Sequence, residues 1–189
     1  ATIVNKLRRF LPDISKSDPL VATVLERVKV LENQGYQFEA AEGSFELLSR
    51  RVQGLYEDKF SLVHFRTINR RDVEKIEDAE AIVKVKIDDQ VFHTVGSGDG
   101  PVNALDRALR KALENEFPAV RLVHLEDYKV RVLSSSDGTA AKVRVLIESS
   151  DGHDSWGTVG VSENVIDASW LALADSLHYK LMKDAIKNE

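Results

Sequence analysis

The chain of 189 residues contains no cysteine. This absence excludes a disulfide, a thiolate zinc site and a cysteine nucleophile, and it fits a protein of a reducing cytoplasm. No apolar run approaches the roughly 20 residues that span a bilayer, so we expect no membrane contact. The chain starts with Ala1 rather than methionine and shows no signal peptide, which we interpret as a piece of a longer protein.

The motifs of common catalytic sites are missing as well. The five histidines are scattered and form neither H-x-H nor H-E-x-x-H, and the sequence has no G-x-S-x-G and no Walker lysine. We therefore predict no metal site and no catalytic residue in this chain. The formal net charge of −5 argues against a nucleic-acid partner, because such a surface does not attract phosphate over its whole area.

The sequence does contain a duplication. Thr94-Val95-Gly96 recurs 64 residues later as Thr158-Val159-Gly160, and in both copies a strand-like stretch ends in glycine before a polar turn and an amphipathic helix. Duplicated units of this kind usually pack together, because neither half buries its apolar face alone. The pattern favours a binding or assembly module over an active site.

The first third of the chain is predicted to be helical. Ser17-Asp18-Pro19 is a helix start signal, Gly35 is placed to end that helix, and a second, shorter helix is expected over 40–52. From Phe60 the apolar period changes to two, which indicates strands. The charged stretch 66–78 has little periodicity and is predicted to be a loop or a linker.

Two units with the same order of elements follow. In the first, alternation over 81–87 and 90–96 predicts a hairpin, and a helix begins at Pro101. The second unit has three strand patterns and a final helix, over 128–132, 141–147, 155–160 and from 165 onward. The two units predict an α+β fold of duplicated βββα units, with two three-stranded sheets and two helices after a small helical subdomain.

The turn Gly96–Pro101 joins a strand to a helix. Backbone N–H groups at such a junction can hold an anion or a carboxylate. The glycines can equally serve a tight turn that needs positive φ angles. Both interpretations stay open on the residues alone.

At this point the sequence resembles a known family. Residues 31–48 resemble the linker subdomain that follows the catalytic barrel in the 2-isopropylmalate synthase and citramalate synthase family. Four further motifs resemble that family's C-terminal regulatory domain: 98–105, 125–128, 138–141 and 156–164. The details of 127–133 and 161–164 look most like the citramalate synthase branch.

The resemblance implies a helical linker subdomain over 1–58 and, over 59–189, a regulatory domain that dimerises and binds an end-product amino acid. The parent enzyme would condense acetyl-CoA with pyruvate on a divalent-metal TIM barrel that this chain lacks, so we expect no turnover and no cofactor here. It would be a cytoplasmic homodimer that binds isoleucine. The alternatives are a leucine-binding regulatory domain of a 2-isopropylmalate synthase, or a dimerisation module without an effector.

The resemblance also implies a set of effector-binding residues, namely Gly98, Asp99, Gly100, Pro101, Val102, Asn103, Leu125, Tyr128, Val132, Ala141 and Val143. The first six would lie near the charged groups of the effector, and the others would form the wall and shape its pocket. Asp99 replaces the asparagine that is frequent in the family's turn, and its carboxylate would attract an ammonium group but repel a carboxylate. Val143 is bulkier than the alanine of some leucine-responsive relatives, but one methylene is worth only about 1–3 kcal/mol, so isoleucine and leucine both stay open.

Overall fold

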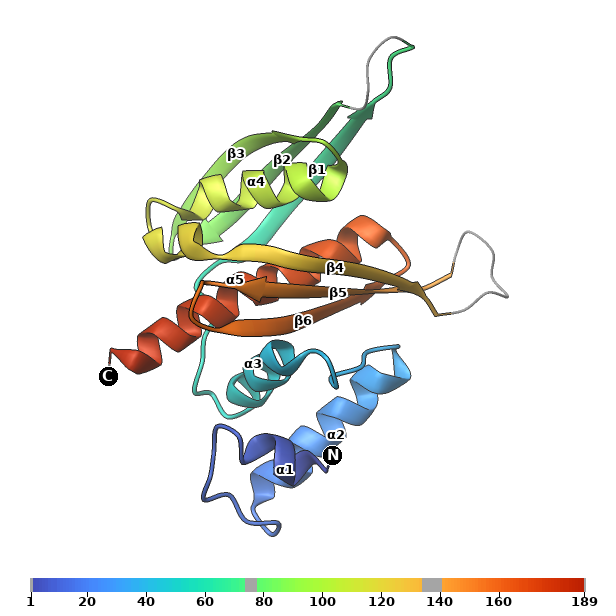
Figure 1. The fold of residues 1–189 in the computed structure, drawn as a ribbon. Helices are drawn as coiled ribbons and strands as arrows, with labels where there is room; N and C mark the ends of the chain where they lie inside the picture. Colours follow the sequence, from blue (N-terminus) through green and yellow to red (C-terminus); the bar gives the residue numbers. More distant parts are fainter. Residues whose placement is uncertain (1, 74–77, 134–140, 189) are drawn as a thin grey trace. The chain divides into compact units, whose positions relative to one another are not determined.

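The structure, a computed structural model, describes residues 2–73, 78–133 and 141–188. Within these residues the chain forms five α-helices, one short 3₁₀-helix and two three-stranded sheets (Figure 1). The elements confirm the predicted α+β fold of duplicated βββα units. None of the helices in the described part of the chain combines the length and the apolar character that a membrane crossing requires.

The chain divides into two contact units, each of which gathers segments that are distant in sequence. Contact unit 1 comprises Ala1–Glu57, Glu126–Ser149 and Ser155–Tyr179. Contact unit 2 comprises Asp58–Leu125, Ser150–Asp154 and Lys180–Glu189. The N-terminal helices therefore belong with the second βββα unit, whereas the first βββα unit belongs to contact unit 2.

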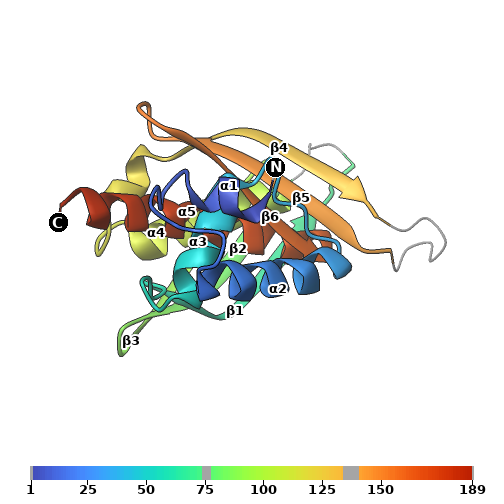
Figure 2. The same ribbon diagram turned by 90° about the horizontal axis from the view of Figure 1, so that it is seen from below.

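The N-terminal part contains α1 (Ile3–Leu7), α2 (Pro19–Asn33) and α3 (Glu42–Val52), which pack on one another (Figure 2). Asp18 caps α2 by accepting the N–H of Leu20 at 2.9 Å, as the start signal predicts. The chain leaves α2 through Gly35, whose φ of 109° strongly favours glycine. The core of this part is aliphatic and aromatic, with Leu7, Val24, Val28, Phe38 and Phe45 buried.

The first repeat consists of β1 (Ser61–Arg70), β2 (Asp78–Ile87), β3 (Gln90–Gly98) and α4 (Pro101–Leu113). Its strands are antiparallel in the order β1-β2-β3. Within the predicted alternation over 81–87, Val83, Val85 and Ile87 are buried, and α4 packs on β2 and β3. A short 3₁₀-helix, which the sequence did not predict, follows at Pro118–Leu122.

The prediction of a loop over 66–78 is wrong at both ends. β1 continues to Arg70, and β2 already begins at Asp78, which pairs with Arg70. β1 is an edge strand whose residues are mostly exposed. Charged side chains are common on such strands because they discourage pairing with another chain, so no apolar period marks this end of the strand.

The second repeat consists of β4 (His124–Val132), β5 (Val143–Ser150), β6 (Ser155–Ser162) and α5 (Val165–Lys187), with strand order β4-β5-β6. Trp156 and Trp170 are buried, and the Trp156 indole N–H donates to the carbonyl oxygen of Ser176 at 3.1 Å. Residues 134–140, between β4 and β5, lie outside the described residues.

The 64-residue repeat is reproduced in three dimensions. The hydroxyl of Thr94 donates to the carbonyl oxygen of Ala108 at 2.7 Å, and that of Thr158 donates to the carbonyl oxygen of Ala172 at 2.7 Å. In both repeats a glycine follows two residues later, and a Cβ there would collide with backbone atoms of the helix. The last strand of each repeat therefore lies against its helix by the same contact.

The N-terminal helices pack on β6, the edge strand of the second sheet. The backbone N–H of Val159 donates to the Ser44 hydroxyl at 3.0 Å, and the backbone of Val161 is hydrogen-bonded to the Tyr36 hydroxyl. A Cβ at Gly157 would lie 2.1 Å from the carbonyl oxygen of Ala40. Side chains of the N-terminal part thus satisfy alternate backbone groups of an edge strand that has no further neighbour among the described strands.

Candidate effector-binding site

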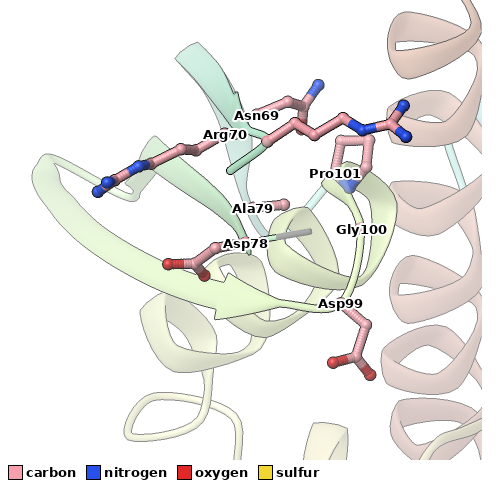
Figure 3. Close-up of a pocket in the computed structure, with 8 residues that line it drawn as sticks. Asn69, Arg70, Asp78, Ala79, Asp99, Gly100 and Pro101 are labelled. Carbon is pink, nitrogen blue, oxygen red and sulfur yellow. The ribbon is translucent and has the colours of Figure 1, made fainter. Parts of the chain in front are cut away.

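A pocket of about 260 Å³ lies in the first repeat, beside the N-terminus of α4 (Figure 3). Asp99, Gly100 and Pro101, on the turn after β3, form one wall. The other wall comes from the end of β1 and the start of β2, and it consists of Asn69, Arg70, Arg71, Asp78 and Ala79. The pairing of β1 with β2 and of β2 with β3 brings these three segments together.

Neither Gly98 nor Gly100 has a positive φ angle, and only Gly98 is required by close packing. Gly98 pairs with Ala79, and a Cβ on Gly98 would lie 2.4 Å from the side-chain oxygen of Asn103. Gly100 has an extended backbone with φ of −157°, and a Cβ there would meet nothing within 4 Å. The explanation by positive φ is therefore wrong for Gly98 and Gly100, and Gly100 leaves open space at the end of α4.

The N-terminus of α4 has no side-chain cap. Gly100 occupies the N-cap position and Pro101 follows it, so no hydroxyl or carboxylate accepts the first free N–H groups. Asn103 instead turns back and accepts the N–H of Asp99 at 3.4 Å. The helix end can therefore offer backbone N–H groups and its positive dipole end to an anion in the pocket.

The pocket wall carries charges of both signs. Arg70 is paired with Asp72 at 2.9 Å, whereas Arg71 has no ion-pair partner within the described ranges. Asp78 and Asp99 contribute two carboxylates, and they come from different segments (Figure 3). Arginine and carboxylate side chains in one small pocket match the carboxylate and ammonium groups of an amino acid.

The predicted site residues fall into two groups. Gly98–Asn103 lie on the turn and the first turn of α4, in contact unit 2, where Asp99, Gly100 and Pro101 line the pocket but Gly98, Val102 and Asn103 do not. Leu125, at the start of β4, also belongs to contact unit 2. The remaining residues belong to contact unit 1, and they are Tyr128, Val132, Ala141 and Val143.

Within contact unit 1, Tyr128 and Val132 lie on β4, Ala141 precedes β5 and Val143 begins it. The Tyr128 hydroxyl is hydrogen-bonded to the Ser169 hydroxyl at 2.7 Å, so the ring is held toward α5. Val132 is 60% exposed, whereas Ala141 is buried. Tyr128 and Val132 thus present apolar surface that the second repeat itself does not cover.

Sequence reasoning missed the second wall of the pocket. Asn69, Arg70, Arg71 and Asp78 fall in the stretch that was predicted to be a loop. No apolar alternation continues through Arg70, whose end of the strand is exposed, so the sequence offered no local signal for this wall. Among the described residues, no group of three or more histidine, aspartate or glutamate side chains is placed to bind a metal ion.

Comparisons with known proteins agree with this architecture. The family model for the LeuA allosteric (dimerisation) domain matches residues 39–181. The chain therefore belongs to the family of LeuA allosteric (dimerisation) domains.

The relatives differ in how closely they match. The chain is 50% identical over 186 residues to an (R)-citramalate synthase of Aquifex aeolicus and 50% identical over 184 residues to one of Geobacter sulfurreducens; each match covers 97% of this chain and 35% of the relative. It is 27% identical over 171 residues to a 2-isopropylmalate synthase of Aquifex aeolicus, a match that covers 81% of this chain and 31% of that relative. The chain thus spans about a third of the length of the relatives it matches.

Proposed function

We propose that the chain is the regulatory and dimerisation region of a citramalate synthase that condenses acetyl-CoA with pyruvate, and that it binds isoleucine as a feedback inhibitor between two copies of the chain. Three observations support this proposal. The family is defined by dimerisation and allosteric control. Identity is much higher to citramalate synthases than to a 2-isopropylmalate synthase. The structure has an uncapped helix end in a pocket of mixed charge.

The open space at Gly100 is the observation that carries the ligand assignment. An isoleucine carboxylate would lie at the N-terminus of α4 near Arg71, where backbone N–H groups and a guanidinium stabilise negative charge. Its ammonium would face Asp78 or Asp99. Asp99 would then favour the effector, because it would meet the ammonium rather than the carboxylate.

The branched side chain of the effector needs an aliphatic wall, and among the described residues the only apolar side chains that line this pocket are those of Ala79 and Pro101. Leu125, Tyr128, Val132, Ala141 and Val143 are the residues we propose for that wall. A site completed by a second copy would make effector binding and dimer geometry depend on each other. Inhibition then requires the effector to bind the inhibited arrangement more tightly, with a coupling of typically about 1–3 kcal/mol.

The test is calorimetric titration of the chain with isoleucine, leucine and valine, with dimer mass followed by light scattering. We expect isoleucine to bind best and to change the dimer mass or its stability. Tighter leucine binding would assign the chain to leucine control instead. A stable dimer that gives no heat and no thermal shift with any of the three amino acids would reject the effector site and leave a dimerisation module.

Two variants locate the binding site. Gly100→Ala adds one methyl group to open space at an allowed φ, so it should leave the fold intact and weaken isoleucine binding. Arg71→Gln should weaken binding by about 1.5–3 kcal/mol, the usual range for a hydrogen bond to a charged group. Arg121→Gln is the matched control, because Arg121 is an exposed arginine of contact unit 2 paired with Glu114 outside the pocket. Binding unchanged in both pocket variants would place isoleucine elsewhere.

A further inference from the structure

A second pocket, of about 240 Å³, lies within contact unit 1, where the N-terminal helices pack on the second repeat. Most of its wall is aliphatic or aromatic. The wall residues come from α2, the segment after it, α3, β6 and α5, and they are Leu31, Tyr36, Phe38, Leu48, Val159 and Leu171. A pocket of this lining and size suits a small branched hydrocarbon group.

Three charged groups also line this pocket, and they do not cancel. Asp175 already has two partners: one carboxylate oxygen accepts the Ser44 hydroxyl at 2.8 Å, and the other pairs with the Arg51 guanidinium at 3.0 Å. Arg51 therefore neutralises Asp175. Arg27, on α2, remains as a cation with no ion-pair partner among the residues that the structure describes. The pocket thus carries one uncompensated positive charge beside its aliphatic and aromatic wall.

The walls of the pocket are held in place by hydrogen bonds. Ser44 accepts the backbone N–H of Val159 while it donates to Asp175, so α3, β6 and α5 are joined at one point. Tyr36 is bonded to the backbone of Val161, and burial raises the pKa of its hydroxyl, which therefore stays protonated. A ligand would meet a preformed wall, which lowers the entropic cost of binding.

We propose that this pocket binds a small branched aliphatic monocarboxylate, whose alkyl group packs among Leu31, Leu48 and Leu171 and whose carboxylate pairs with Arg27. The charge of the site selects this class. A carboxylate gains an ion pair with Arg27, whereas the ammonium of an amino acid would meet Asp175 only in competition with Arg51, which already pairs with it. The site is separate from the pocket at α4, and it does not depend on isoleucine being the effector there.

The position of the pocket gives the ligand a structural effect. Its walls belong both to the N-terminal helices and to the second repeat, so a bound carboxylate contacts both and stabilises their packing. Binding should therefore raise the unfolding temperature of the chain and slow amide exchange at Val159 and Val161, whose N–H groups lie at this contact.

Isothermal titration and thermal unfolding of the whole chain with isovalerate test the proposal, and isovaleramide and isoleucine serve as comparison ligands. Isovaleramide has the same alkyl group without the charge, and isoleucine adds an ammonium. We expect isovalerate to bind and to stabilise, and isovaleramide to bind at least about tenfold more weakly, as the loss of one charged contact implies. Equal binding of the acid and the amide, or no binding of isovalerate, would overturn the proposal.

Three variants separate this pocket from the one at α4. Arg27→Gln should weaken isovalerate about tenfold or more, and Leu171→Trp should block it by filling the pocket from a half-exposed position. Arg71→Gln, at the α4 pocket, should leave isovalerate binding unchanged. If isovalerate binding is lost in Arg71→Gln and kept in Arg27→Gln and Leu171→Trp, the carboxylate occupies the α4 pocket and the inference is wrong.

Discussion

The two repeats share the contact between their last strand and their helix, and they differ at two other places. At the N-cap of the helix, the first repeat has Gly100 and the second has Asn164, its counterpart 64 residues later. The Asn164 side chain accepts the N–H groups of Ile166 at 2.8 Å and Asp167 at 3.3 Å. The second helix end is therefore satisfied by its own residue, whereas the first is left open beside a pocket. The duplication has kept the contact between strand and helix and left one of the two helix ends without a side-chain cap.

The second difference is the face of the sheet that points away from the helix. Since Thr94 contacts α4, its neighbours His93 and Val95 point away from that helix. Their counterparts, Gly157 and Val159, lie under the N-terminal helices. The same residue type at equivalent positions is 47% exposed as Val95 and 1% exposed as Val159. The outer face of the first sheet is thus open, whereas that of the second sheet packs against the N-terminal helices.

The largest expected effect on stability comes from Gly157, which lies under the N-terminal helices, whereas its counterpart His93 lies on the open face of the first sheet. Gly157→Ala places a Cβ 2.1 Å from the Ala40 carbonyl oxygen, a backbone atom that cannot turn aside. We expect a loss of about 3 kcal/mol in the free energy of unfolding by urea titration. His93→Ala, at the equivalent position of the first repeat, should change it by less than about 0.5 kcal/mol. Equal effects at the two positions would show that the packing of the N-terminal helices on β6 is wrong.

The next pair of variants makes the same substitution, valine to alanine, at a buried and at an exposed position. Val159→Ala should cost about 2 kcal/mol, because it removes two buried methyl groups and leaves a cavity in the core of the N-terminal part. Val95→Ala should cost less than about 0.5 kcal/mol if the open face of the first sheet is free in solution. A large loss for Val95→Ala that grows with protein concentration would instead show that a second copy covers this face.

The β5–β6 and β2–β3 turns each contain an aspartate, and the two aspartates differ in what they contact. Asp151, in the β5–β6 turn, accepts the N–H groups of Asp154 and His153 and pairs with Lys180 at 2.6 Å, within contact unit 2. The bonds from the Asp154 backbone and from Lys180 hold the pKa of Asp151 far below its usual value. In the β2–β3 turn, Asp89 is fully exposed, and Lys86 approaches it only to 4.0 Å.

A carboxylate with a lowered folded-state pKa stabilises the fold above about pH 4, and this contribution is lost as the pH falls toward the folded pKa. Asp151→Asn should therefore cost about 1.5 kcal/mol at pH 7, and its stability should approach that of the wild type as the pH falls below about 4. Asp89→Asn should follow the wild type at every pH. The measurement is urea unfolding from pH 3 to pH 7, and a constant gap for Asp151→Asn would contradict the ion pair.

Sequence features within a few residues of one another predicted many of the helices and strands. Contacts between residues far apart in the sequence were missed. Asp18 with Pro19, and Gly35, mark helix ends through groups within a few residues, and the 64-residue spacing correctly predicted two βββα units. The second wall of the pocket was missed because Arg70 and Asp78 lie on exposed strand ends without an apolar period. The packing of Ser44 on Val159 joins residues 115 positions apart, so no window of sequence contains it. Gly157 could have been noticed only by aligning it with His93.

The smallest expected effect on stability comes from exchanging the two N-cap residues. Asn164→Gly removes a side-chain cap from α5, and Gly100→Asn supplies one to α4, so we expect changes of about 0.5 kcal/mol in opposite directions. Their effects on isoleucine binding should differ much more. The Gly100→Asn side chain would occupy the N–H groups proposed for the ligand carboxylate and should abolish the titration heat, whereas Asn164→Gly should bind as the wild type does. Undiminished isoleucine binding by Gly100→Asn would show that the effector does not recognise the uncapped N-terminus of α4. The difference between the two N-cap residues would then not explain why one repeat binds the effector.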